Sequence, residues 1–398
     1  MNTTISYFKT TGKIITGIKS VTTLPQEIKL LGGKRVFVFT DEGIVKAGIC
    51  EKVLQILEGA VESVSVFGKI PPEPPLETID ECLKLAREAR CDLIIGLGGG
   101  SAMDVAKVIS VLLTNEKTLA QMIGINLVEK RGIPKILIPT TAGTGSEVTP
   151  IVILTDQAEN LKKGVVSDFL FPETAILDPE LTVSLPPGAT AASGMDALIH
   201  AIEAYTSVNS TPMTDHLALR AIELVVANIR SAWANGNNLE ARMNMLEGSL
   251  LAGQAFANAG VTAVHAFAYP LGGEFHVAHG VANTVMLCAV LRFNMLADLK
   301  KFAALGELLC PDVPSLDNKV LAEAGIDFLE GLIVDLQLPR TLQELNVPQD
   351  AIPRMAEGVM KVTRLLANNP RRITLEDANK IYQDVYFTNR TSRGVCGG

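Results

Sequence analysis

Histidine is rare in this chain, yet its histidines are concentrated in one part of the sequence. The 398 residues include five histidines, and four of them fall between His200 and His279 on apolar segments. Three of these lie within the fifteen residues of "HAFAYPLGGEFHVAH". A single histidine in an apolar segment is usually held by partners in the protein core, whereas a concentration of this kind favours a shared metal ion.

A carboxylate accompanies these histidines. Asp196 and His200 are four residues apart in "SGMDALIHAIEAY", so both side chains would lie on one face of a helix. Imidazoles and a carboxylate together form a mixed nitrogen and oxygen ligand set, which suits Fe(II) or Zn(II). The sequence therefore predicts a metal site made of Asp196, His200, His265 and His279. His216, in "MTDHLALR", has charged neighbours and is expected to be exposed.

A glycine-rich turn could hold a phosphate-containing ligand. In "LIIGLGGGSAMDVAK", Gly98, Gly99, Gly100 and Ser101 follow an apolar run and precede a helical pattern. Backbone amides at a helix N-terminus bind phosphate, and glycine lets the ligand approach the backbone closely. A tight turn between a strand and a helix is the alternative interpretation.

A second turn also favours a nucleotide site. "IPTTAGTGSEVT" supplies Thr140, Thr141 and Thr144 after the next apolar run, and a loop of small turn-forming residues is the alternative. Ligands bind at the carboxyl ends of parallel strands, where both turns would lie. Asp41 ends the run "KRVFVFTD", and a carboxylate there binds ribose hydroxyls and favours NAD over NADP. Because Asp41 precedes the glycines instead of following them, a solvated strand end is the alternative for this residue.

Short apolar runs alternate with helical patterns in the first half of the chain, which predicts a parallel sheet covered by helices. Long helical patterns dominate the second half, and the change falls at the proline-rich "SLPPGAT" of residues 184–190. We therefore expect a Rossmann-like α/β nucleotide-binding domain over residues 1–186 and an all-helical metal-binding domain over residues 187–398. The expected strands are 34–41, 61–68, 91–100 and 135–141, and the expected helices are 46–59, 76–90 and 101–113.

Composition excludes several classes of function. The formal net charge is −8 and no long basic run occurs, so neither nucleic acids nor anionic membranes are expected partners. The N-terminus lacks the apolar core of a signal peptide, and six scattered cysteines fit free thiols in a reducing cytoplasm. Residues 248–273 carry no charge, but polar residues and glycines interrupt them, so we expect a buried helix and its turn.

Taken together, these motifs resemble those of the iron-containing (group III) alcohol dehydrogenases. "GGGSAMDVAK", "PTTAGTGSEVT", "SGMDALIHAIEAY" and "HAFAYPLGGEFHVAHGVAN" are similar to that family's successive signatures and occur in the same order. "NNPRRIT", residues 368–374, is similar to a further one, so the resemblance covers essentially the whole chain. It implies a metal-dependent enzyme that transfers a hydride between NAD(H) and an alcohol or aldehyde in a cleft between two domains. It also implies a homodimer or a larger homo-oligomer.

The resemblance implies roles for single residues as well. The family's metal ligands match the four residues predicted above. Its NAD-binding positions match Asp41, Gly98, Gly99, Gly100, Ser101, Thr140, Thr141, Thr144, Lys162 and Leu181. Its substrate pocket matches Ile151, Phe256, Val261 and Leu365, whose apolar side chains suggest a short alcohol or aldehyde.

Two positions depart from the family's pattern. Some relatives carry a second histidine, proposed to relay protons, four residues after the one that matches His265, and here this residue is Tyr269. An asparagine near the adenine end is replaced by Glu73. Because tyrosine is a poor proton relay at neutral pH, His276 becomes a candidate for proton transfer. A loop histidine that faces solvent is the alternative for His276.

Two other classes of function share part of this pattern. A metal- and NAD-dependent lyase related to dehydroquinate synthase would have the same nucleotide fold but would produce no net NADH. A non-catalytic binding protein would hold metal without turnover. The complete ligand set favours the oxidoreductase over both.

Overall fold

The structure is a computed structural model that describes residues 5–156, 161–314 and 317–387. By their contacts the residues divide into two units. The sheet unit comprises Lys9–Leu185 and Gly236–Leu246. Of the described residues, the helical unit comprises Pro186–Asn235 and those from Glu247 onward, together with the N-terminal residues up to Phe8. The domain ranges 1–186 and 187–398 stay a prediction, and the sequence does not indicate that residues 236–246 belong with the sheet unit.

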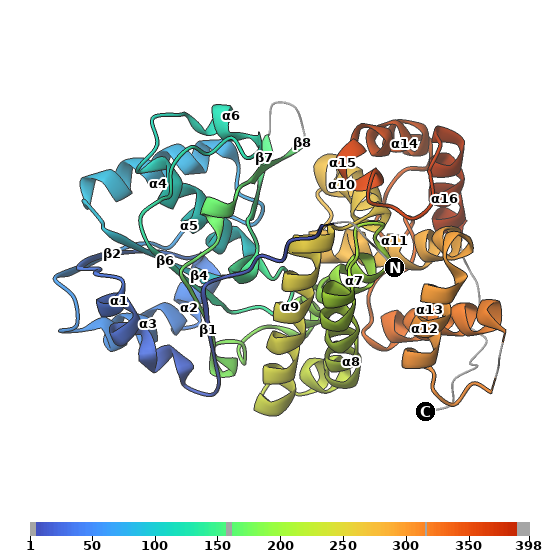
Figure 1. The fold of residues 1–398 in the computed structure, drawn as a ribbon, viewed down its shortest axis with the longest axis horizontal. Helices are drawn as coiled ribbons and strands as arrows, with labels where there is room; N and C mark the ends of the chain where they lie inside the picture. Colours follow the sequence, from blue (N-terminus) through green and yellow to red (C-terminus); the bar gives the residue numbers. More distant parts are fainter. Residues whose placement is uncertain (1–4, 157–160, 315–316, 388–398) are drawn as a thin grey trace. The chain divides into compact units, whose positions relative to one another are not determined.

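The sheet unit contains a six-stranded sheet with the order β1–β9–β6–β4–β2–β3. Figure 1 labels β1, β2, β4 and β6 of this sheet. Every described strand pair in it is parallel. A smaller sheet has the order β5–β8–β7. The strands of the large sheet are β1 Lys13–Thr16, β2 Arg35–Phe39, β3 Ser63–Phe67, β4 Leu93–Gly98, β6 Lys135–Pro139 and β9 Thr174–Leu177. Those of the small sheet are β5 Gly124–Ile125, β7 Ile151–Asp156 and β8 Leu161–Val166.

Alternate residues of each strand face opposite sides of the large sheet. On β2, Phe37 and Phe39 belong to an apolar cluster with α4 and α5, whereas Val36 and Val38 belong to one with α1 and α3. Both faces are therefore covered, as is usual for parallel sheets. The helices of this unit include α1 Leu24–Leu30, α2 Glu42–Lys46, α3 Ile49–Leu57, α4 Leu76–Glu88, α5 Gly100–Leu112 and α6 Leu119–Met122.

The strand order reverses direction between β2 and β4. β2 is followed in sequence by β3 on one side, whereas β4 is followed by β6 on the other. Ligands of parallel sheets bind at the carboxyl ends of such neighbouring strands. The loops that follow β2, β4 and β6 carry Asp41, the glycine-rich turn and the threonine-rich turn. The predicted α/β fold is confirmed, and it places these three segments on neighbouring strands.

The helical unit is centred on α11, which packs against α7, α10, α13 and α16. The described strands all lie before residue 178, so the predicted all-helical second part is confirmed for the described residues. α9 begins within the segment that belongs to the sheet unit and continues in the helical unit. The helices are α7 Pro187–Thr206, α8 Pro212–Ala234, α9 Leu239–Ala259, α10 Ala263–Phe275, α11 His279–Asn294, α12 Leu299–Leu309, α13 Asn318–Asp335, α14 Ile352–Lys361, α15 Thr363–Leu366 and α16 Leu375–Phe387.

One described segment, His279–Ala297, is long and apolar enough to cross a membrane by length and composition. Within the protein, 61% of this segment is buried. It consists of α11 and a following 3-10 turn, and α11 is the central helix of its unit. Residues 248–273, expected as one buried helix and its turn, form the end of α9 and most of α10.

The cysteines follow the sequence-based expectation only in part. Cys50, Cys82, Cys91 and Cys288 are free thiols. Burial raises the pKa of Cys82 to about 12 and that of Cys91 to about 11, so both thiols stay protonated. Cys310 is disulfide-bonded, so the expectation of free thiols is wrong at that residue. Cys396 lies outside the described residues.

Candidate metal centre and cofactor loops

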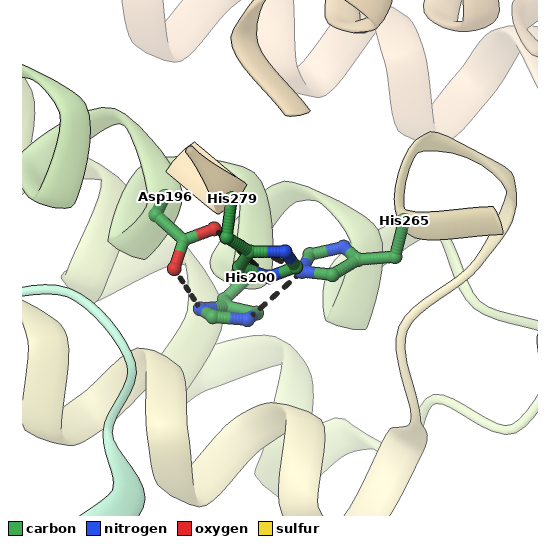
Figure 2. A group of neighbouring side chains, drawn as sticks. All are labelled: Asp196, His200, His265 and His279. Carbon is green, nitrogen blue, oxygen red and sulfur yellow. Dashed lines mark hydrogen bonds and ion pairs between the residues drawn. The ribbon is translucent and has the colours of Figure 1, made fainter. Parts of the chain in front are cut away.

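The four predicted metal ligands lie together in the helical unit (Figure 2). Asp196 and His200 are one turn apart on α7, His265 lies in the first turn of α10, and His279 is the first residue of α11. One possible ligand atom from each residue lies within 4.8 Å of the others. Helical spacing aligns the first pair, and the packing of α10 and α11 against each other and of α11 against α7 places the other two beside it.

The distances between these atoms fit a single metal ion. His265 Nε2 lies 3.0 Å from His200 Nε2. Asp196 Oδ1 lies 3.9 Å from His265 Nε2 and 3.7 Å from His279 Nε2. Ligand atoms bound at about 2.1 Å to one tetrahedral metal stand roughly 3.4 Å apart. Asp196, His200 and His265 are buried, and the His279 side chain is 38% exposed, which gives the cluster one accessible side.

Electrostatics favour the protonation states that bind metal at Asp196 and His200, whereas Glu203 outweighs burial at His265 and raises its pKa. Burial lowers the pKa of His200 to about 4, against the attraction of Asp196, so this imidazole is neutral at pH 7. Burial alone would raise the pKa of the Asp196 carboxyl. The imidazoles of His200, His279 and His265 outweigh that effect and hold the pKa below its usual range. A neutral imidazole and an ionised carboxylate are the forms that donate electron pairs to a metal.

Sequence reasoning missed two residues that contact this cluster. The buried carboxylate of Glu203 contacts His265 Nδ1. The Asn283 amide donates to Asp196 Oδ1 at 2.8 Å and lies 3.2 Å from Nε2 of both His265 and His279. Their spacing carried a signal, because Glu203 follows His200 by three residues and Asn283 follows His279 by four.

The predicted substrate-pocket residues of the helical unit and Tyr269 differ in their contacts and burial. The Phe256 ring stacks on His200 with 4.3 Å between centroids. Leu365 is buried on α15, and the Val261 carbonyl accepts a hydrogen bond from Asn368. Tyr269 lies one helical turn after His265 on α10 and is half-buried, and burial raises the pKa of its hydroxyl.

The two candidate proton-transfer residues differ in exposure. His276 ends α10 in the left-handed region, with a φ of 54°, and its side chain is exposed. This exposure fits both interpretations of the residue, a proton shuttle and a solvent-facing loop histidine. His216 on α8 is exposed, as expected.

In the sheet unit, the glycine-rich and threonine-rich turns touch each other. The Thr140 amide donates to the Gly98 carbonyl at 3.0 Å. A β-carbon built on Gly100 would lie 2.8 Å from Thr144 Cγ2, and one built on Gly99 would lie 3.6 Å from Thr141 Oγ1. Only glycine leaves room between these turns at Gly100.

Asp41 lies beside the glycine-rich turn despite its distance in the sequence. Its Oδ1 accepts a hydrogen bond from the Ile44 amide at 3.0 Å and caps α2. A β-carbon at Gly98 would lie 3.1 Å from Asp41 Oδ2, and Gly98 has a φ of +148° that favours glycine. β2 and β4 are neighbours, so the carboxylate and the turn share one edge of the sheet.

The other predicted cofactor residues of this unit have protein partners or are buried. Ser101 Oγ accepts a hydrogen bond from the Glu73 amide, and Lys162 forms an ion pair with Glu73. Thr140 Oγ1 is buried and has no hydrogen-bond partner among the described residues. Leu181 is 2% exposed within the apolar cluster of α1 and α3, so its contact with a cofactor stays a prediction.

A buried polar network fixes the threonine-rich turn to α5. Asp104 Oδ1 accepts a hydrogen bond from Ser146 Oγ at 2.6 Å, and Oδ2 accepts one from the Ile153 amide at 2.9 Å. Lys107, fully buried, donates to the carbonyl of Ile151, the predicted pocket residue that begins β7, at 2.7 Å. Because α5 also begins at the glycine-rich turn, this helix fixes the positions of the two turns relative to each other.

Comparison with known proteins decides the family. Residues 11–179 match the family described as "Iron-containing alcohol dehydrogenase", and residues 190–386 match "Fe-containing alcohol dehydrogenase family, C-terminal". The chain belongs to the iron-containing alcohol dehydrogenase family. It is therefore an oxidoreductase of the alcohol dehydrogenase type, as its motifs predict, and the comparisons do not support the lyase alternative.

Individual members of the family resemble this iron-containing alcohol dehydrogenase over nearly its full length. It is 43% identical over 366 residues to Long-chain-alcohol dehydrogenase 1 of Geobacillus thermodenitrificans, covering 91% of this chain and 92% of that one. A crystal structure of 1,3-propanediol oxidoreductase matches with a TM-score of 0.93 at 36% identity, covering 96% of this chain and all of that one. The sulfoacetaldehyde reductase from Bifidobacterium kashiwanohense, in complex with NAD+, matches with a TM-score of 0.86 at 30% identity, covering 97% and 100%. The substrates in these names differ, so the likeness carries the family and not the substrate.

Proposed function

We propose that this protein transfers a hydride between NAD(H) and a short-chain alcohol or aldehyde and that it uses Fe(II). The proposed ligands are Asp196, His200, His265 and His279, and Zn(II) suits the same set. The convergence of these four side chains within 4.8 Å is the observation that carries the proposal, and the lowered pKa values of Asp196 and His200 support it. Membership of the family supports both NAD(H) and a metal.

The bound groups and the protein's side chains would have separate tasks. When bound, the metal would supply Lewis acidity toward the substrate oxygen, and NAD would accept or donate the hydride. The Phe256 ring, which stacks on His200, would exclude water and favour a small apolar substrate. Val261 and Leu365 of the helical unit and Ile151 of the sheet unit are the further proposed pocket residues. We assign proton transfer to His276 in preference to Tyr269, whose hydroxyl has a raised pKa.

For the cofactor, we propose that the glycine-rich turn binds the pyrophosphate. The close approach of the two turns and the glycine-only geometry at Gly98 support this role. The carboxylate of Asp41 would accept hydrogen bonds from the adenosine ribose and repel a 2′-phosphate. The remaining proposed cofactor residues are Gly99, Gly100, Ser101, Thr140, Thr141, Thr144, Lys162 and Leu181.

Two further properties are proposals that rest on the family resemblance and on composition. We propose that the protein is a homodimer or a larger homo-oligomer and that it acts in the cytoplasm. A sedimentation measurement of the purified protein tests the first. Localisation of a tagged chain in its own host tests the second.

The metal proposal is tested with a ligand variant and a matched histidine control. His279→Ala removes an expected ligand, so metal content and turnover should both be lost, while NADH binding by the sheet unit should survive. His216→Ala removes an exposed histidine and should change neither. Metal content comes from elemental analysis of anaerobically purified protein, and NADH binding from fluorescence titration. A His279→Ala protein with native metal content and rate would contradict the ligand assignment.

The substrate proposal is tested by an activity screen. NADH oxidation is followed with short, long, hydroxylated and sulfonated aldehydes, before and after a chelator, and again after Fe(II) or Zn(II) is added back. We expect turnover of short neutral aldehydes that the chelator abolishes and Fe(II) restores. Chelator-resistant turnover would overturn the metal proposal, and a preference for long or sulfonated aldehydes would overturn the substrate proposal.

A further inference from the structure

Glu203 is a fully buried carboxylate with two sets of partners. Its relative exposure is 0%, and it lies on α7, three residues after the proposed ligand His200. Oε1 accepts hydrogen bonds from Thr262 Oγ1 at 2.6 Å and from the Val264 amide at 2.7 Å. Oε2 contacts His265 Nδ1. Each oxygen therefore has its own partners, at the N-terminus of α10 and at the imidazole.

The contact with Oε2 determines which His265 nitrogen is free. A carboxylate only accepts hydrogen bonds, so Nδ1 must carry the proton in this contact. The other ring nitrogen, Nε2, then keeps its lone pair. Nε2 is the atom that points into the cluster, 3.0 Å from His200 Nε2 and 3.9 Å from Asp196 Oδ1. The protonated and ligating sides of the ring thus match the two sides of the site.

We propose that Glu203 is a positioning residue that holds His265 with Nδ1 protonated and Nε2 directed at the metal. The inference rests on the proposed metal site and adds to it a residue outside the ligand set. Carboxylate partners of metal-binding histidines fix the tautomer and the ring orientation and raise the ligand's basicity. Burying an ionised carboxylate such as that of Glu203 destabilises the folded protein unless such partners are present.

A purely structural role is the competing explanation. Thr262 precedes α10 and Val264 lies in its first turn, so Oε1 alone could serve as a cap for that helix. The two roles use different oxygens of one carboxylate. Variants that affect one oxygen at a time therefore separate them.

Glu203→Gln affects the imidazole side. The variant amide has one acceptor oxygen, which the two N-terminal donors of α10 would keep at the Oε1 position. Its NH2 group would then face His265 Nδ1, and the ring would have to carry its proton on Nε2. We expect the metal dissociation constant, from competition with a coloured chelator, to rise about 10- to 100-fold. The ligand-field spectrum of the Co(II)-substituted protein should change, because one ligand is lost or reoriented.

Thr262→Val is the matched control for the helix-cap side. It removes one donor to Oε1 and leaves the contact between Oε2 and His265. We expect a lower melting temperature of the metal-free protein with little change in metal affinity or in the Co(II) spectrum. Native metal affinity and spectrum in Glu203→Gln would overturn the proposal. Equal loss of metal affinity in both variants would also overturn it, because the cap alone would then explain Glu203.

A measurement on the unmutated protein keeps the inference testable if Glu203→Gln does not fold. The chain has five histidines, so ring-nitrogen NMR of 15N-histidine-labelled, Zn(II)-loaded protein gives few signals. We expect His265 to show a protonated Nδ1 and a zinc-bound Nε2. A zinc-bound Nδ1 would overturn the inference. Failure of the native protein to bind Zn(II) at all would instead refute the proposed function.

Discussion

Glu73 holds Lys162 by an ion pair in which Oε2 lies 2.6 Å from Nζ. The Glu73 amide also donates to Ser101 Oγ at 3.1 Å, and Lys162 donates to Thr155 Oγ1 at 3.1 Å. Lys162 and Ser101 are proposed cofactor residues, and the resemblance to the family suggests that many relatives have an asparagine at the position of Glu73. Glu73 therefore places a negative charge beside two proposed cofactor residues and pairs with the cationic side chain of Lys162.

Glu73→Gln should strengthen NADH binding. Removing the carboxylate charge leaves Lys162 free to attract the pyrophosphate. The gain should be severalfold at low ionic strength and smaller in high salt, because salt screens partly exposed charges. Fluorescence titration with NADH at two salt concentrations measures it. Glu77→Gln is the control, since it removes an equal charge from an exposed position on α4. Weaker or salt-independent binding in Glu73→Gln would contradict the prediction.

Asp41 should set the preference for NADH over NADPH. Asp41→Asn keeps an oxygen that can cap α2 and removes only the charge, whereas Asp41→Gly removes both. We expect kcat/KM with NADPH to come closer to kcat/KM with NADH in both variants, because repulsion of the 2′-phosphate is lost. If Asp41→Asn kept the native ratio, charge would not be the basis of selectivity. Equal use of both cofactors by the native enzyme would show that Asp41 does not set a preference for NADH.

His276→Ala should lower the maximal rate of alcohol oxidation by about tenfold or more, which is within the usual range of general acid–base catalysis or just below it. Imidazole is the side chain whose charge changes near neutral pH, so the acid limb of the pH–rate profile should shift as well. Metal content should stay at the native level. Tyr269→Phe should have a smaller effect, since burial raises the pKa of that hydroxyl. The reverse ranking, or an unchanged pH profile, would show that His276 only faces solvent.

Glu147 should make the protein less stable as the pH rises. Burial raises the pKa of this carboxyl from 4.5 to about 7, although its backbone contact and Lys107 oppose the shift. Between those values the unfolded chain loses a proton that the folded chain keeps, so stability falls as the pH increases. At about 1.4 kcal/mol per pKa unit, the loss is at most about 3.5 kcal/mol. The melting temperature of Glu147→Gln, measured relative to that of the native protein, should therefore rise from pH 5 to pH 8. A constant difference would contradict this.

The central strands were predictable from sequence because each is a buried apolar run that ends in a turn signal. The bounds of β2, β4 and β6 all fall within two residues of those expected. β1 and β9 were missed because each has four residues and pairs across a long separation, Lys13 with Thr174. Such short edge and near-edge strands leave no periodic pattern, and only the folded sheet shows that the first and last strands of this unit are neighbours.

The metal cluster could be predicted because its residue types are rare and its first pair has helical spacing. Glu203 and Asn283 were not singled out, because their helical spacing from His200 and His279 is a weak signal for residue types that are common in the chain. Their contacts depend on α10 and α11 packing beside α7. Asp41 shows the opposite case. Its position in the sequence, far before the glycines, argued against a role in cofactor binding, whereas the pairing of β2 with β4 places it beside the glycine-rich turn.

The four proposed ligands come from three helices, α7, α10 and α11, that are separate in sequence. An ion that binds them only in the folded state adds RT ln(1 + [M]/Kd) to stability, about 2.7 kcal/mol when the free metal is 100 times Kd. The helical unit would then respond to the supply of iron in the cell. In iron-poor cells a larger share of molecules would open and reach proteases, so iron scarcity would lower the amount of enzyme as well as its activity.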